Sequence, residues 1–95
     1  MGVYAADIEK MEAQLKSWGA QIKLLEAKIE FAHSTIKLQR AREVNELRRK
    51  QRIASEKIYE MRSTSSKAWE QVKGAADKIW DDLKTGIAIA ESNVT

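Results

Sequence analysis

The chain has 95 residues, of which 33% are charged, 43% hydrophobic and 6% aromatic, and it carries a net charge of +3. It contains no cysteine, which excludes disulfide frameworks, thiolate nucleophiles and cysteine-ligated zinc sites. The absence of proline and the high charged content are typical of long helices. No apolar run approaches the roughly 18 residues of a membrane-spanning helix, and residues 1–11 lack the apolar region of a signal peptide. We therefore expect one all-α domain over residues 1–95, located in the cytoplasm.

The first predicted element is a helix from about residue 4 to about residue 62, and its N-terminal half follows a heptad pattern. Apolar residues recur in alternating steps of three and four, which places them on one stripe of a coiled-coil helix. The stripe consists of Ile8, Met11, Leu15, Trp18, Ile22, Leu25, Ile29, Ala32 and Ile36. Because a rod of this kind hides its stripe only against other helices, we expect a homo-oligomer that uses these residues as its seam.

The middle of this helix is polar where the pattern calls for core residues. Gln39 and Glu43 fall on the seam, and buried polar groups at such positions cost stability but fix register and strand number. We interpret the two residues as a specificity device.

A basic segment covers the same region. Residues 37–52 contain seven basic and two acidic side chains, and the candidate patch consists of Arg40, Arg42, Arg48, Arg49, Lys50 and Arg52. Such a run could contact phosphates and bind nucleic acid with a salt-dependent affinity. The segment lacks aromatic residues for base stacking, and a solvated helix face has the same composition. We therefore favour the solvated face over nucleic-acid binding.

The C-terminal half follows a longer, hendecad period. Residues 67–73 (KAWEQVK) are echoed eleven positions later by residues 78–84 (KIWDDLK). Steps of three, four and four begin at Ile58, which gives about 3.67 residues per turn and a straight or right-handed seam. The seam residues of this half are Leu47, Ile58, Met61, Trp69, Val72, Trp80 and Leu83.

A break is predicted at residues 63–66, which form the Ser-Thr-Ser-Ser cluster. Such side chains hydrogen-bond their own backbone and favour caps and turns. A turn here would fold a second helix, at about residues 67–90, back on the first as a hairpin. It would bring Asp77, Asp81 and Asp82 roughly opposite Arg52, Arg49 and Arg48. The alternative is a continuous rod, because the hendecad phase runs through the cluster without interruption.

No constellation of catalytic residues is evident. His33 is the only histidine, and Glu30 stands three residues before it, as in the Glu-x-x-His step of di-iron bundles. Both residues lie off the seam, whereas a di-iron site needs them to project inward. We expect no enzyme activity, no cofactor, no metal and no small-molecule substrate.

The tryptophan repeat suggests a membrane-surface alternative. A stripe containing Trp69 and Trp80 with flanking lysines could lie in a lipid interface. Large apolar residues at seam spacing are more often core residues. We therefore keep peripheral membrane binding as the second interpretation.

Three segments resemble a family of small bacterial coiled-coil proteins. They are residues 10–18 (KMEAQLKSW), 68–73 (AWEQVK) and 79–84 (IWDDLK), and the resemblance extends over nearly the whole chain. Most members of that family are uncharacterised and some are labelled as stress-response proteins, so the resemblance implies a cytoplasmic bacterial protein without implying a reaction. The sequence therefore predicts a non-enzymatic, homo-oligomeric coiled-coil interaction protein with a structural or stress-related role.

Overall fold

The structure is a bundle of three helices. A computed structural model describes residues 4–94 of the chain, with side chains described to residue 93. The helices are α1 (Ala5–Ile29), α2 (Ser34–Ser63) and α3 (Trp69–Val94), and each packs against the other two. No strand occurs among the described residues, so the all-α prediction is confirmed.

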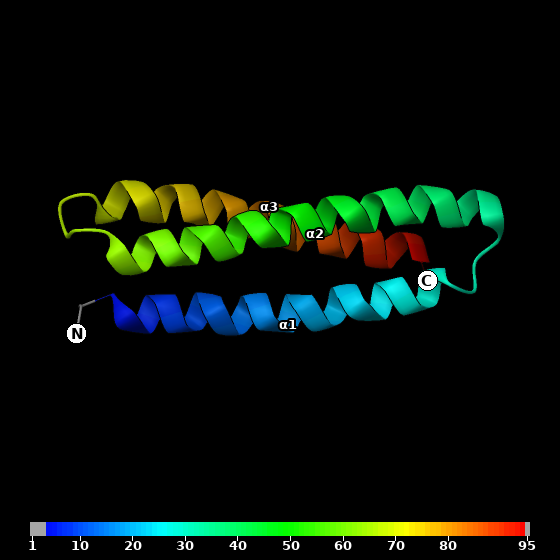
Figure 1. Cartoon of the computed structure of the whole chain (residues 1–95), viewed down its shortest axis with the longest axis horizontal. Helices are drawn as coiled ribbons and strands as arrows, with labels where there is room; N and C mark the ends of the chain where they lie inside the picture. Colours follow the sequence, from blue (N-terminus) through cyan, green and yellow to red (C-terminus); the bar gives the residue numbers. More distant parts are fainter. Residues whose placement is uncertain (1–3, 95) are drawn as a thin grey trace.

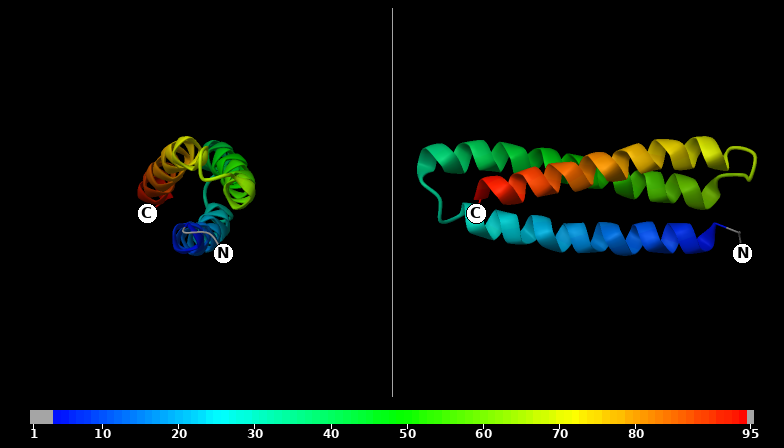
Figure 2. Two further views of the ribbon diagram at one scale, coloured as in Figure 1. Left: turned by 90° about the vertical axis from the view of Figure 1, so that its left-hand side faces the viewer. Right: turned by 180° about the vertical axis from the view of Figure 1, so that it is seen from behind.

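Successive helices run in opposite directions along an elongated body of 51 × 18 × 17 Å (Figure 1). In the end-on view of Figure 2 they occupy the corners of a triangle. The C-terminus therefore lies at the same end as the turn between α1 and α2, and the start of α1 lies beside the turn between α2 and α3. This antiparallel order follows from two short connections, because short loops join helices that are neighbours in space.

The heptad stripe of α1 faces the core along the whole helix. All seven of its members from Ile8 to Ile29 are buried. In α2 the buried residues begin only at Val44, so none of the first ten residues of that helix is fully buried. The core therefore thins out towards the turn between α1 and α2.

The helix predicted from about residue 4 to about residue 62 is in fact two helices. The chain leaves α1 after Ile29 and enters α2 at Ser34, so the prediction of one helix there is wrong. The sequence gives no signal for this turn, since residues 30–33 contain neither glycine nor proline. The turn forms because α1 can then bury its stripe against α2 and α3 of its own chain.

The second turn lies at the serine-threonine cluster. α2 ends at Ser63, and α3 begins at Trp69. The Ser63 hydroxyl donates to the carbonyl oxygens of Tyr59 and Glu60, and the Thr64 hydroxyl donates to the Glu60 carbonyl at 2.6 Å. These bonds satisfy carbonyl groups that a helix end otherwise leaves without partners.

Thirteen of the sixteen predicted seam residues are buried, Ala32 is partly buried, and Ile36 is exposed. Val72 is partly buried, and Ile36 retains 47% of its exposure because it lies in the part of α2 that the core does not reach. The core also contains residues outside that predicted set, namely Val44, Ala54, Ala76, Ile87 and Ala90.

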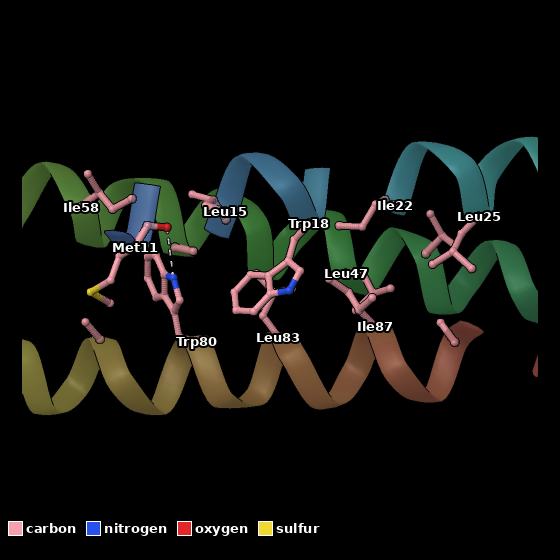
Figure 3. Packing of buried hydrophobic residues seen from close by; sticks show 14 of the residues in the cluster. Met11, Leu15, Trp18, Ile22, Leu25, Leu47, Ile58, Trp80, Leu83 and Ile87 are labelled. Atoms are coloured by element: carbon pink, nitrogen blue, oxygen red, sulfur yellow. Dashed lines mark hydrogen bonds between the residues drawn. The ribbon is translucent and has the colours of Figure 1, made fainter. Parts of the chain in front are cut away.

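Aromatic rings fill the contact between α1 and α3. Figure 3 shows Trp80 of α3 reaching across to α1, where its indole Nε1 donates to the carbonyl oxygen of Met11 at 3.3 Å. Trp18 and Trp80 lie with ring centroids 6.5 Å apart, and Tyr4 stacks on Trp69 at 4.0 Å. These large side chains join two helices that the backbone brings together less closely than the other pairs.

Candidate interaction surface

The basic segment at residues 37–52 lies on α2, and carboxylates match most of its charges. Two of these carboxylates belong to neighbouring helices and two to α2 itself. The ion pairs are Arg40–Glu43 (2.6 Å), Arg48–Glu26 (2.5 Å), Lys50–Asp82 (3.2 Å) and Arg49–Glu46. Within residues 4–94, Arg42 and Arg52 are the members of the predicted patch that make no ion pair.

The Glu46–Arg49 pair lies on the solvent face. Arg49 donates from Nε to both carboxylate oxygens of Glu46 at 3.1 Å. This hydrogen bonding holds the pKa of Glu46 below its ordinary value and raises the pKa of Arg49. Both groups are therefore charged at neutral pH, and the pair reduces the net positive charge that α2 presents to solvent.

The predicted pairing of aspartates with arginines is replaced by a different set of ion pairs. Asp82 pairs with Lys50, and Asp77 pairs with Lys73 of its own helix at 2.6 Å. Arg48 lies on the side of α2 that faces α1 and pairs there with Glu26.

Of the two residues predicted as a polar device in the seam, the structure places Glu43 at the edge of the core and leaves Gln39 exposed. Arg40 takes the inward position and pairs with Glu43, which also accepts from Asn93 Nδ2 at 3.4 Å. Arg40 Nε and Glu43 Oε2 are buried without a hydrogen-bond partner in the described part of the chain. In α2, Arg40 rather than Gln39 takes the inward position of this polar layer, and it pairs there with Glu43.

The three tryptophans are buried. Trp18, Trp69 and Trp80 retain 5–6% of their exposure, and Figure 3 shows Trp18 and Trp80 facing the interior of the bundle. The stripe considered for lipid binding is therefore the stripe that closes the core. No helix within residues 4–94 is long and apolar enough to cross a membrane.

Exposed apolar side chains gather at the end of the bundle that holds the turn between α1 and α2. Phe31, in the turn, is 91% exposed. Of the six large hydrophobic residues that are exposed between residues 4 and 93, only Tyr59 lies towards the opposite end. We refer to the other five as the turn-end residues: Leu24, Phe31, Ile36, Leu38 and Ile89. Exposed apolar side chains at one end of the bundle make that end the candidate contact surface.

The described residues hold no group of three or more histidine, aspartate or glutamate side chains that could bind a metal ion. Glu30 and His33 are both exposed at the turn between α1 and α2.

At the opposite end, Tyr4, Ile8 and Met61 line an open hollow, and the Glu12–Arg62 ion pair lies at its side. The ion pair in this hollow is a link between α1 and α2.

Comparisons with known proteins add no assignment. No protein-family model, curated protein or solved structure matches the chain. The function is therefore argued from the surface of the bundle.

Proposed function

We propose that the chain is a non-enzymatic interaction protein that works as a homo-oligomer. The observation that carries this proposal is the gathering of the turn-end residues at one end of the bundle, with Phe31 91% exposed. Burial of apolar surface favours association by about 25 cal/mol per Å², so exposed aromatic and aliphatic side chains at one end give a ready contact surface. The cytoplasmic location and the stress-related role belong to the proposal on the strength of the family resemblance alone.

The surface supports association with protein better than association with nucleic acid or lipid. Ion pairs occupy four of the six basic side chains considered for phosphate binding, which lowers the number of counterions that nucleic acid could release. The tryptophans would reach a lipid surface only if the core opened. The turn-end residues are accessible without any change in the bundle.

Light scattering coupled to size-exclusion chromatography tests the proposal. We expect the unmodified chain to run as a dimer or a higher oligomer. A double substitution, Phe31→Glu with Ile36→Glu, places charges among the turn-end residues and should shift the chain to a monomer. Tyr59→Glu is the matched control, because Tyr59 is also exposed but lies towards the other end. An unmodified chain that stays monomeric, or a double variant that associates as before, would refute the proposal.

A further inference from the structure

We infer that two copies of the chain exchange their α1 helices. In the exchanged dimer, residues 5–63 of each chain form one continuous helix, and α1 of each copy packs against α2 and α3 of the other. Each half of the dimer then repeats the three-helix bundle described above. The inference rests on the proposed self-association and specifies how it occurs. Its evidence is the construction of the turn at residues 30–33.

The turn departs from a helix at very few residues. Glu30 keeps right-handed helical angles (φ −55°, ψ −29°). The amides of Phe31 and Ala32 donate to the carbonyl oxygens three residues earlier, at 3.3 and 3.0 Å, so helical winding persists in a tighter form. At His33, with φ −59° and ψ 150°, the backbone is extended. Straightening the chain therefore requires a large rotation of ψ at His33.

Nothing in the turn ties it in the closed form. His33, at the start of α2, makes no side-chain capping hydrogen bond, and no described residue has the positive φ that commonly ends a helix. The other turn differs, because Ser63 and Thr64 cap the end of α2 with their hydroxyl groups. The first turn is therefore the hinge, whereas the second holds α3 against α2.

The apolar stripe continues across the hinge in phase. Ile29, Ala32 and Ile36 follow in steps of three and four, as in the rest of α1. A continuous helix would keep these side chains on one face, whereas in the closed bundle Ile36 is 47% exposed. The sequence is thus compatible with both states, which is the condition for exchange of an element between identical copies.

The exchange also accounts for the exposure of two of the turn-end residues, Phe31 and Ile36. Two antiparallel long helices related by a two-fold axis would cross at their hinges. Phe31 and Ile36 of both copies would then lie near that axis, where they can cover one another. A continuous helix from Ala5 to Ser63 would be about 88 Å long.

A cross-linking experiment distinguishes exchange from docking of closed bundles. Glu12 of α1 and Arg62 of α2 form an ion pair at the end of the bundle away from the hinge. In a dimer of closed bundles that dock through their turn ends, Glu12 of one copy and Arg62 of the other lie at opposite extremes. After exchange they are adjacent.

The chain has no cysteine of its own, so a chain with Glu12→Cys and a mass-tagged chain with Arg62→Cys can be unfolded together, refolded and treated with a short thiol cross-linker. We expect a cross-linked heterodimer.

The variant Ser34→Pro locks the closed form. Ser34 is the first residue of α2, where proline is well tolerated, and His33 before it already has the extended conformation that precedes proline. In a continuous helix the same proline would remove a backbone hydrogen bond and clash with the preceding turn. We expect it to weaken dimerisation at least about 100-fold and to abolish the cross-link. Ser34→Ala is the matched control and should dimerise as the unmodified chain does. Circular dichroism checks that both variants are folded.

The outcomes separate the inference from the proposed function. A monomer at every concentration overturns both. A dimer that gives no cross-link between positions 12 and 62, or that survives Ser34→Pro unchanged, overturns the exchange and leaves self-association standing. Deletion of residues 31–33 gives an independent result, because without a turn α1 cannot fold back on its own chain. This variant should form only dimers, and a folded monomer would overturn the exchange.

Discussion

The glycines inside the helices test the packing of the bundle, because the space beside each of them differs. Replacing a glycine in a helix interior with alanine normally stabilises by about 1 kcal/mol, through the backbone entropy of the unfolded chain. At Gly74 an added methyl group would meet nothing within 4 Å. Gly74→Ala should therefore raise the free energy of unfolding by the full amount of about 1 kcal/mol.

Gly86 lies where α3 approaches α2 closely. A Cβ atom there would lie 2.8 Å from Cδ2 of Leu47, a buried residue with little room to move. Overpacking of this kind costs about 1–3 kcal/mol, which exceeds the gain in propensity. Gly86→Ala should therefore destabilise the protein by about 1 kcal/mol. A Cβ at Gly19 would lie 2.9 Å from the side-chain nitrogen Nε2 of Gln51, which is the tip of a flexible side chain and can move aside. The stability of Gly19→Ala should therefore lie between those of Gly74→Ala and Gly86→Ala.

Urea unfolding followed by far-ultraviolet circular dichroism, at one protein concentration for all variants, measures these differences. We expect the free energy of unfolding to decrease in the order Gly74→Ala, Gly19→Ala, unmodified chain, Gly86→Ala. In thermal unfolding each 1 kcal/mol should appear as a shift of about 4–8 °C. The packing of α2 on α3 is the same in the closed and the exchanged forms, so the order holds for either. If Gly86→Ala stabilises as much as Gly74→Ala, then α2 and α3 do not approach as described.

Three further substitutions probe the core and the surface. Trp80→Ala removes an indole ring between α1 and α3 together with its hydrogen bond to Met11, and should lower the free energy of unfolding by about 3–5 kcal/mol. A loss under about 1 kcal/mol in urea unfolding would contradict the burial of this ring. Arg48→Ala breaks an ion pair with Glu26 that is partly exposed to solvent, so it should lower the free energy of unfolding by less than about 1 kcal/mol. A larger decrease, or one that 1 M salt does not reduce, would contradict this. Because the pKa of Glu46 is lowered in the folded state, its pairing stabilises above the ordinary value of 4.5 and is lost as the pH falls through the lower, folded value. Glu46→Gln should therefore lower the melting temperature slightly at pH 7 and not at pH 2, whereas an equal effect at both values would contradict the assignment.

The apolar stripes could be predicted from the sequence because spacing alone determines which face of a helix is apolar. The steps from Ile8 to Ile29 identified the buried face of α1, and the repeat containing Trp69 and Trp80 identified that of α3. Serine and threonine side chains carry a local capping chemistry, which is why residues 63–66 could be proposed as a break.

The first turn could not be predicted in the same way. Residues 30–33 carry no glycine, proline or capping serine, and the stripe passes through them without a change of phase. The turn is stabilised by tertiary contacts, because α1 buries its apolar stripe against α2 and α3 when it folds back. The inward position of Arg40 and the pairing of Arg48 with α1 depend on how α1 packs against α2, so they too could not be predicted from the spacing of residues.

A stripe of apolar residues specifies a face but not the molecule that covers it. For α1, the face of α2 and α3 that it needs is identical whether it belongs to the same chain or to another copy. Whether the closed monomer or the exchanged dimer forms then depends on two free energies, that of forming the turn and that of bringing two chains together. The free-energy cost of bringing two chains together falls as the protein concentration rises. A turn with strong caps would fix the choice in favour of the monomer. The hinge at residues 30–33 has no such caps, and the large side chains that it leaves exposed favour the second copy. The rod expected from the heptads and the compact bundle are therefore two arrangements of the same contacts, related by rotation at His33.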